Sequence, residues 1–339
     1  MEERDRKAEH IRLALDARMQ ADGNHFDAYR FEHCALPEVD FDEIDTRCRF
    51  LGRELSAPLL ISCMTGGTDD AERINRNLAR AAEETGVAVG VGSQRKALED
   101  PSRSGSFMIR PFAPTVPILG NLGAVQLNYG YGIRQCRAAV EMIDADALVL
   151  HLNPLQEAIQ PEGQRNFATL LPKIGQIVSE LEVPVIAKEV GCGISRVVAE
   201  RLMRHGVEIV DTAGVGGTSW ARIEAARAGD AEIGERFADW GIPTPEALRG
   251  LRGLTGLTVI GSGGVRNGVD AAKAIACGAD LVGLAYRFLR AADQSKEKVV
   301  ESIRRIVEEL KISMFCVGAR TIAELGQVEL RHSRADGVR

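Results

Sequence analysis

Short apolar runs alternate with polar or glycine-rich corners and with amphipathic helical segments from residue 57 onward. Eight runs predict strands: Leu59–Met64, Val87–Gly90, Pro117–Asn121, Ala147–His151, Pro184–Lys188, Glu208–Thr212, Thr258–Ser262 and Asp280–Leu284. Helical periodicity follows at 70–84, 135–143, 166–181, 195–205, 244–251 and 268–277. Continuous apolar strands are typical of parallel sheets covered on both faces. Strands that alternate with helices indicate βαβ units, so we expect an α/β protein that closes into a (β/α)8 TIM barrel.

The chain outside these repeats has a different pattern. Residues 3–18 place Ile11, Leu13 and Leu15 among many charges, which predicts an amphipathic helix. We assign residues 1–56 to this N-terminal helix and an irregular lead-in segment that packs on the barrel, 57–329 to the barrel, and 330–339 to a disordered tail. A doubly wound sheet is the alternative fold. It is disfavoured because no Gly-x-Gly-x-x-Gly follows the first strand.

Composition narrows the class of protein. A chain of 339 residues with 45% hydrophobic content can bury one large core. Its net charge of -6, from 42 basic and 48 acidic residues, provides no field that would attract nucleic acid or an anionic membrane. The seven cysteines form no Cys-x-x-Cys pair, and no long apolar stretch follows Met1. We therefore expect a cytoplasmic protein.

Polar side chains interrupt the fourth predicted strand as it enters a helix, within residues 151–157. The strand period of two places His151 and Asn153 on one face. Asn153 is a good N-cap and Pro154 suits a first helical position, so the helix should carry Gln156 and Glu157 in its first turns. Each residue also has an ordinary interpretation, as a cap or a core histidine. Barrel enzymes place their sites at such strand ends, which favours chemistry here.

Two further features at the carboxyl ends of the predicted strands, which form one rim of the barrel, suggest a phosphate-bearing cofactor. Gly263-Gly264-Val265-Arg266 precedes a helix, and Ala285 forms a small corner after the last strand, so both loops can grip a phosphate. Lys188 ends an apolar strand, either as a Schiff-base nucleophile or as a cationic partner of an electron-rich ring. With Asn121 and Ser93 as hydrogen-bonding groups, these features favour flavin mononucleotide (FMN). A phosphosugar held as a Schiff base fits them almost as well.

The motifs resemble those of the type 2 isopentenyl-diphosphate isomerases over nearly the whole chain. His-x-Asn-x-x-Gln-Glu at 151–157 beside Lys-Glu-Val-Gly at 188–191 is the most specific. The other carriers are Arg6-Lys7-x-x-His10, Met64-Thr65-Gly66-Gly67, Gly92-Ser93-Gln94-Arg95, Asn121-Leu122-Gly123, 214–222 and Ser262-Gly263-Gly264. Cys63 and Tyr286 are minor departures from the family pattern.

The resemblance implies an enzyme that uses FMN and Mg²⁺ to interconvert isopentenyl and dimethylallyl diphosphate, with NADPH as the reductant of FMN. Because no obvious pair of protein acid and base lies on the rim, we expect reduced FMN itself to serve as the acid–base group. It implies His151, Gln156 and Lys188 as catalytic residues and Glu157 as the metal ligand. The implied substrate-binding residues are Arg6, Lys7, His10, Ser93, Gln94, Arg95, His151, Asn153 and Gln156. The implied FMN-binding residues are Met64, Thr65, Gly66, Ser93, Asn121, Lys188, Thr218, Gly263, Gly264, Val265, Arg266, Ala285 and Tyr286. A homotetramer or homo-octamer is also implied.

Other classes of protein match the rim less well. A flavin-dependent 2-hydroxy-acid oxidase needs a histidine base beside an arginine, and no histidine follows the seventh predicted strand closely. An inosinate-type dehydrogenase needs a nucleophilic cysteine in the loop after the sixth strand, where residues 214–220 contain none. A non-catalytic flavin or phosphate sensor would need only the phosphate grip, and not the polar residues at 151–157.

Overall fold

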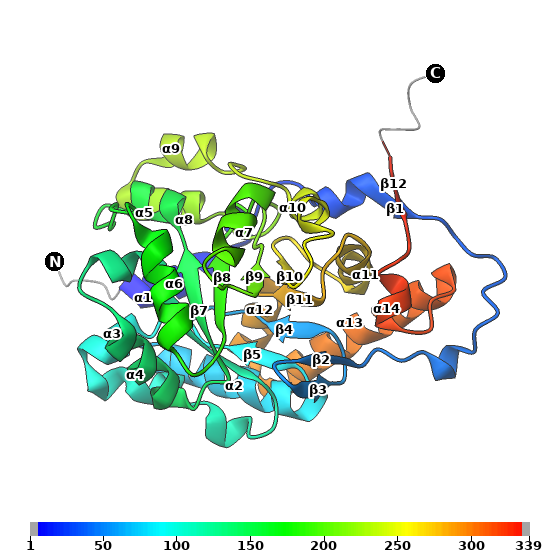
Figure 1. Ribbon diagram of the computed structural model, residues 1–339, viewed down its shortest axis with the longest axis horizontal. Coiled ribbons are helices and arrows are strands. Elements are labelled where there is room, and N and C mark those ends of the chain that lie inside the picture. Colours follow the sequence, from blue (N-terminus) through cyan, green and yellow to red (C-terminus); the bar gives the residue numbers. More distant parts are fainter. Residues whose placement is uncertain (1–5, 334–339) are drawn as a thin grey trace.

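The computed structural model describes the backbone of residues 6–333 and the side chains of 7–333. Eight parallel strands form a closed barrel in the order β10-β11-β4-β5-β6-β7-β8-β9, which confirms the TIM barrel (Figure 1). Their bounds are β4 Leu59–Ile61, β5 Ala88–Gly90, β6 Ile118–Gly123, β7 Ala147–Leu152, β8 Val185–Glu189, β9 Ile209–Asp211, β10 Thr258–Ser262 and β11 Leu281–Leu284. Each lies within or next to a predicted apolar run. Within residues 6–333, no helix is long and apolar enough to cross a membrane.

Helices surround the barrel and cover the outer face of its strands. The helices that the periodicity predicts are α2 Asp69–Thr85, α4 Ile133–Ile143, α6 Leu170–Glu180, α7 Arg196–Met203, α10 Thr244–Leu251 and α11 Gly268–Ala276. The others are α3 Arg95–Glu99, α5 Pro154–Ile159, α8 Trp220–Ala228, α9 Ala231–Arg236, α12 Tyr286–Gln294, α13 Lys296–Val317 and α14 Ile322–Leu325. Short 3-10 segments lie at 101–107, 110–112 and 124–128.

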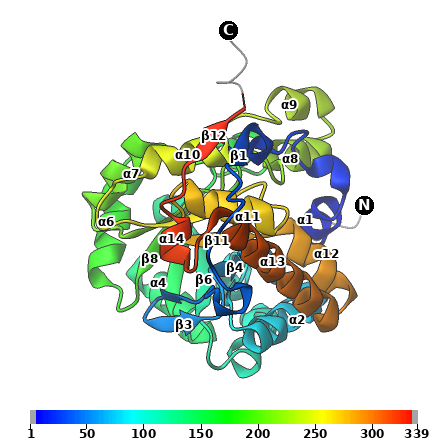
Figure 2. The ribbon, with the colours of Figure 1, turned by 90° about the vertical axis from the view of Figure 1, so that its right-hand side faces the viewer.

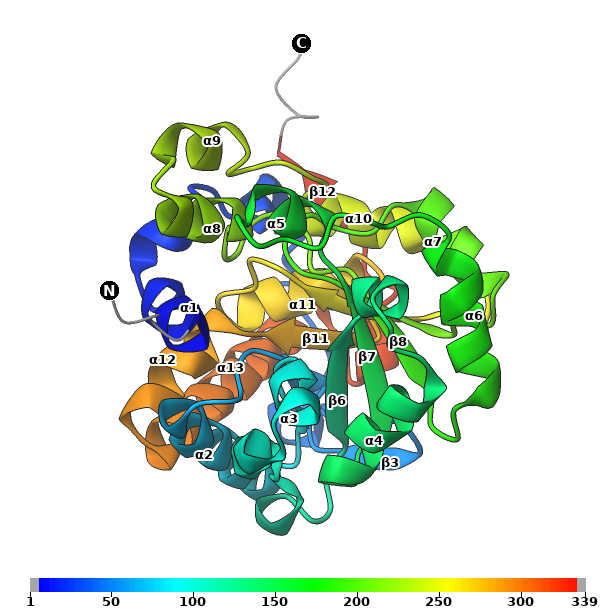
Figure 3. The ribbon, with the colours of Figure 1, turned by 90° about the vertical axis from the view of Figure 1, so that its left-hand side faces the viewer.

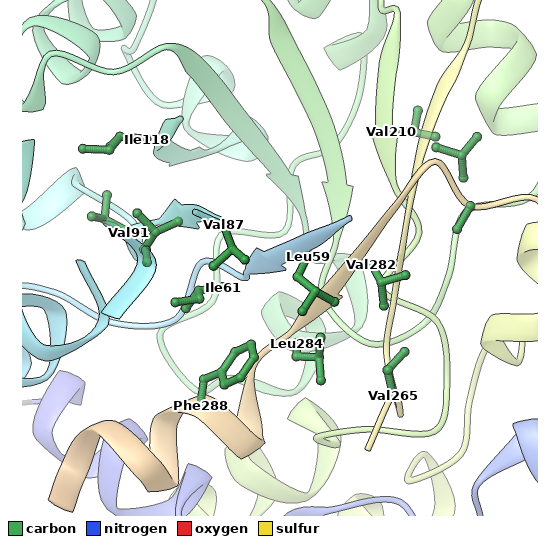
Figure 4. Packing of buried hydrophobic residues seen from close by; sticks show 14 of the residues in the cluster. Leu59, Ile61, Val87, Val91, Ile118, Val210, Val265, Val282, Leu284 and Phe288 are labelled. Atoms are coloured by element: carbon green, nitrogen blue, oxygen red, sulfur yellow. The ribbon is translucent and has the colours of Figure 1, made fainter. Parts of the chain in front are cut away.

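The apolar core has two parts, because barrel strands are buried on both faces. Residues such as Ile61, Val282 and Leu284 point outward and pack against Phe288 and the surrounding helices (Figure 4). Alternate residues, including Leu60, Leu119, Ile186 and Ile260, fill the barrel interior. The hairpin of β2 (Cys48–Phe50) and β3 (Arg53–Leu55) adds Phe50 and Leu55 to this inner cluster. The interior is therefore a packed support for the rim, not a channel.

Both ends of the described chain pack on the barrel. Helix α1 (Arg6–Ala14) lies beside α8 (Figure 3), and 3-10 segments at 17–19, 25–28 and 41–43 continue the lead-in. Strand β12 (Leu330–His332) pairs antiparallel with β1 (Tyr29–Phe31), as Figure 2 shows. The expectation of a disordered tail is therefore wrong for Leu330–His332. A three-residue strand depends on a partner about 300 residues away in sequence, which local pattern cannot reveal. Residues 334–339 lie outside the described range.

Candidate active site

A cavity of about 940 Å³ opens at the carboxyl ends of the barrel strands. Among the residues proposed from the sequence, it is lined by Lys7, His10, Met64, Thr65, Ser93, Arg95, Asn121, His151, Asn153, Gln156, Glu157, Lys188, Thr218, Gly263, Gly264, Val265, Arg266, Ala285 and Tyr286. The closed barrel brings these residues together because all its parallel strands end on one rim. Its volume lies within the usual range for ligand pockets.

A layer of polar side chains forms the floor of the cavity. His151 of β7 is paired in register with Lys188 of β8, and Lys188 with Asp211 of β9. His151 Nδ1 lies 2.8 Å from Asn121 Oδ1. Burial, followed by the charges of Lys188 and Lys7, lowers the pKa of His151 from 6.5 to about 4. The imidazole is therefore neutral at pH 7 when the cavity holds no anion.

The predicted helix start at Pro154 is confirmed, although Asn153 does not cap it with its side chain. Instead, Asn153 Nδ2 donates to Gln156 Oε1 and to Glu157 Oε1, each at 3.0 Å. The other Glu157 oxygen accepts the backbone N–H of Gln164 at 2.6 Å. Asn153 Oδ1 is buried without a hydrogen-bond partner among the described residues. Asn153 thus orients the two residues that the sequence singles out, while its own carbonyl remains available to a ligand.

Glu224 of α8 is a functional candidate that the sequence did not identify. Its side chain is fully buried. Gln156 Nε2 donates to Glu224 Oε1 at 2.8 Å, and His10 Nε2 lies 3.0 Å from the same oxygen. Arg227 Nη1 donates to Glu224 Oε2 at 2.5 Å. Burial raises the pKa of Glu224, but the contacts with His10, Gln156 and Arg227 outweigh it and lower the pKa, so the carboxylate is ionised at neutral pH.

Helix α1 forms one wall of the cavity in its own chain. Lys7 Nζ donates to the Ser93 carbonyl at 2.7 Å and lies 5.1 Å from the centroid of the Phe107 ring. His10 makes an edge contact with Trp220, with ring centroids 5.3 Å apart. Glu9 pairs with Arg227 at 3.3 Å. Lys7 and His10 therefore reach the cavity in cis. The side chain of Arg6, the third member of this motif, lies outside the described residues.

The glycine grip is the loop Gly263–Arg266 after β10 together with the corner at Ala285 after β11. Its two glycines have backbone conformations and close neighbours that leave no room for a side chain. Gly263 and Gly264 have φ values of +100° and +76°. A Cβ on Gly264 would lie 2.6 Å from the carbonyl carbon of Gly216, so two glycine-rich loops touch here. Helix α11 begins shortly after Arg266, and helix α12 begins directly after Ala285. Both helices therefore direct their positive N-terminal ends toward the grip.

Among the predicted ligand residues that the structure describes in full, two do not line the cavity. Gln94 is fully buried in the barrel wall, where its Nε2 donates to the Ala139 carbonyl at 2.7 Å and its Oε1 accepts the Asn121 N–H at 2.9 Å. As a correction, the Gln94 side chain supports Asn121 and has no surface to offer a substrate. Gly66 lies against Phe107, whose ring would overlap a Cβ at that position. Both residues belong to the sequence motifs, and the motifs alone do not show which of their members line the cavity.

Comparison with known proteins identifies the family. The profile of the FMN-dependent dehydrogenase family matches residues 13–109 and 142–332. The isopentenyl-diphosphate delta-isomerase of Paracoccus zeaxanthinifaciens is 53% identical over 94% of this chain and 94% of its own. The isopentenyl-diphosphate delta-isomerase of Nostoc sp. is 49% identical over 94% of this chain and 93% of its own. The chain belongs to the isopentenyl-diphosphate delta-isomerase family. It is therefore an enzyme of the isomerase class.

Solved structures similar to this isomerase confirm its fold. A lactate oxidase of Pediococcus acidilactici matches with a TM-score of 0.68 and 16% identity, over 97% of this chain and 87% of its own. A mandelate oxidase matches with a TM-score of 0.65 and 17% identity, over 96% of this chain and 92% of its own. At this identity the likeness concerns the barrel alone.

The site of this isomerase fits the FMN of its family. Ser62 Oγ and Tyr286 Oη line the cavity, are buried, and have no hydrogen-bond partner within residues 7–333, so they are open to a polar ligand. The glycine grip offers backbone N–H groups for a phosphate. Lys188 places a cation in the barrel mouth, 3.7 Å from the Asp211 carboxylate. The donor set therefore suits a ring with a phosphate tail.

Proposed function

We propose that this isomerase interconverts isopentenyl diphosphate and dimethylallyl diphosphate, with reduced FMN as acid–base group and with Mg²⁺. One observation carries the proposal: a single cavity joins the glycine grip and Lys188 to a wall that contains Lys7, Arg95 and Glu157. The first part suits a flavin and the second suits a diphosphate. The family identity adds independent support.

The flavin would lie across the barrel mouth with its phosphate on the grip. Met64, Thr65, Asn121 and Thr218 line this part of the cavity and are proposed to hold the ring. When bound, reduced FMN would supply the proton added to the alkene and accept the proton lost from the allylic carbon. Lys188 would hold its ammonium beside the ring, where a cation favours an electron-rich form. NADPH is proposed to act only as the reductant of FMN.

The diphosphate is proposed to bind at the opposite wall. It carries roughly three negative charges at neutral pH, which cations and N–H donors must balance. Lys7, His10 and Arg95 supply such groups, and an approaching diphosphate would raise the pKa of His151 toward protonation. Asn153 offers a free carbonyl as acceptor for any bound water. Gln156, held by Glu224, would face the reacting part of the substrate.

Glu157 is proposed to hold the magnesium ion. Within the described chain, no three His, Cys, Asp or Glu side chains cluster as a metal site. Mg²⁺ suits such a place because it keeps several waters and is often bound by one or two carboxylates plus substrate phosphates. Glu157 is buried and oriented by Asn153 and Gln164, yet it lines the cavity. The metal would thus enter together with the diphosphate.

The decisive experiment measures isomerisation of labelled isopentenyl diphosphate after anaerobic reduction of the purified protein. Labelled dimethylallyl diphosphate should form only with FMN, a reductant and Mg²⁺ present, and removal of Mg²⁺ by a chelator should stop it. A yellow protein that forms no product would contradict the proposed reaction and would favour a flavin-binding sensor. Consumption of a 2-hydroxy acid with reduction of the flavin would favour an oxidase.

Assembly and location belong to the same proposal. A homotetramer or homo-octamer in the cytoplasm is proposed from the family resemblance, with no nucleic-acid or membrane partner. Light scattering of the purified protein, with and without substrate, measures the assembly. A monomer at micromolar concentration in both samples would contradict it.

A further inference from the structure

Asp211, which the proposed mechanism does not yet use, lies beside the lysine of the cavity floor. Asp211 Oδ2 is 3.7 Å from Lys188 Nζ, and the two residues are register partners on β8 and β9. The side chains of Lys188 and Asp211 are 11% and 1% exposed. Such a pair is held by the barrel backbone itself, because both residues lie at the carboxyl ends of neighbouring strands of the same sheet.

Further hydrogen bonds fix both partners. Lys188 Nζ donates to the backbone carbonyl of Glu189 at 2.6 Å. Asp211 Oδ1 accepts from Ser262 Oγ at 2.5 Å and from the Ala213 N–H at 3.3 Å. Ser262 and Lys188 line the cavity, whereas Asp211 lies behind them. The carboxylate is therefore placed to act on a cavity ligand through Lys188 and not by contact.

The loop that follows Lys188 is also tied down by a buried acid. The Glu189 carboxylate accepts the N–H groups of Val190 and Gly191 at 2.6 Å each, and it also accepts the N–H of Cys192. This keeps the Glu189 carbonyl, the second partner of Lys188, in one place. The ammonium group consequently has one defined position at the barrel mouth, set by Asp211 on one side and by the Glu189 carbonyl on the other.

We propose that Asp211 is a positioning residue that sets the electrostatic field of Lys188 on the flavin. Its carboxylate holds the ammonium back at a fixed position in the cavity floor, so that the reduced flavin is stabilised less than an unrestrained lysine would stabilise it. The inference rests on the proposed placement of the flavin over Lys188. In a partly buried site, a unit charge acts over several ångströms with little screening.

Measurement of the flavin reduction potential in the holoenzyme tests the proposal. Asp211→Asn keeps the size of the side chain and an acceptor for Ser262 but removes the negative charge. We expect the affinity for reduced over oxidised FMN to rise at least about tenfold, which corresponds to about 30 mV for a two-electron couple. Asp146→Asn is the matched control, since Asp146 pairs with Arg53 and Arg110 at 2.6 Å at the opposite, amino-terminal end of β7. The control should leave the potential unchanged.

Action through Lys188 is tested by combining the substitutions. Lys188→Met alone should lower the potential, and adding Asp211→Asn to it should shift the potential much less than it does in the native background. An unchanged potential in Asp211→Asn would overturn the proposal. An equal shift in both backgrounds would overturn it too, because Asp211 would then act on the flavin directly. If Asp211→Asn does not fold, Asp211→Thr removes the same charge and keeps a hydroxyl for Ser262.

A second readout needs neither FMN nor substrate. In the apo-protein, Lys188→Met leaves the Asp211 carboxylate buried without its cation, which should lower the Tm by at least about 4 °C. The Lys188→Met/Asp211→Asn protein should recover part of that loss. Purely additive Tm changes would contradict the pairing. Because potentials and Tm values are measured without isoprenoid substrate, a failed isomerase assay leaves these results interpretable and affects only the proposed reaction.

Discussion

His151 and Asn121 are joined by a 2.8 Å hydrogen bond between His151 Nδ1 and Asn121 Oδ1. A carbonyl oxygen only accepts, so in the neutral ring the proton is on Nδ1 and the lone pair is on Nε2. Gln94 supports this arrangement, because its side chain accepts the backbone N–H of Asn121. The bond therefore fixes both the orientation and the tautomer of an imidazole in the cavity floor.

The depressed pKa of His151 predicts an acid-dependent loss of stability. The pKa of His151 is 6.5 in the unfolded chain, whereas burial lowers it to about 4 in the folded protein. The unfolded state thus binds more protons between these values, and stability falls as pH decreases from 6.5 to 4, by up to about 3 kcal/mol. We expect apo His151→Gln to lose less unfolding free energy than the native protein over this range. Urea unfolding at pH 7 and pH 4.5 measures this difference, and equal losses would contradict it.

The barrel was predictable because its signals are local. The run Ala147–Leu150 is apolar throughout, and a strand buried on both faces requires this. The placement of His151 and Lys188 on one rim followed from counting such runs. Glu224 and Asp211 were not predictable as partners, since each acquires its role only when the sheet brings residues from distant strands and helices together. Glu224 lies in α8, a helix that the periodicity did not indicate.

The glycine grip predicts a sharp difference between two glycines of similar conformation. Gly264 and Gly253 have φ values of +76° and +82°, so alanine costs backbone strain of about 1 kcal/mol at either position. Only at Gly264 would the new Cβ collide with the Gly216 carbonyl, whereas Gly253 has nothing within 4 Å. We expect Gly264→Ala to lose at least tenfold in FMN affinity and Gly253→Ala to retain it. The ratio of flavin to protein absorbance in purified samples reports this. Equal flavin content would contradict a phosphate grip at Gly264.

Removal of the Glu224 charge should lower turnover but leave flavin binding unchanged. Glu224→Gln keeps the size of the side chain but removes the charge between His10, Gln156 and Arg227. Because these contacts orient Gln156, we expect kcat to fall about 10²-fold, the scale of a misplaced catalytic group, with flavin content unchanged. Glu235→Gln is the matched control, since Glu235 is exposed and pairs with Arg222 at 3.0 Å. A native kcat in Glu224→Gln would show that this contact is only structural.

At Glu157 the structure shows contacts that the sequence motif does not predict. The sequence placed it in the first turn of a helix, but could not show that Asn153 and the Gln164 N–H hold its two oxygens at 3.0 and 2.6 Å. Gly163 permits this wrapping, because a Cβ there would lie 1.9 Å from the Glu157 carbonyl oxygen. The loop after α5 thus closes around the carboxylate. It contains no apolar pattern from which such a conformation could be read.

These contacts predict that metal binding depends on the Glu157 charge and on the diphosphate together. In Glu157→Gln, an amide cannot provide the anionic oxygen that Mg²⁺ prefers, so turnover should fall at least 10²-fold and no longer respond to added Mg²⁺. Electron paramagnetic resonance of Mn²⁺, used as the probe metal with inorganic diphosphate, measures affinity directly. We expect at least tenfold weaker Mn²⁺ binding in Glu157→Gln and native binding in Glu162→Gln, whose side chain pairs with Arg227 at 2.7 Å. Native Mn²⁺ affinity in Glu157→Gln would refute the ligand role, because among the described residues no group of three or more His, Cys, Asp or Glu side chains offers the ion another site.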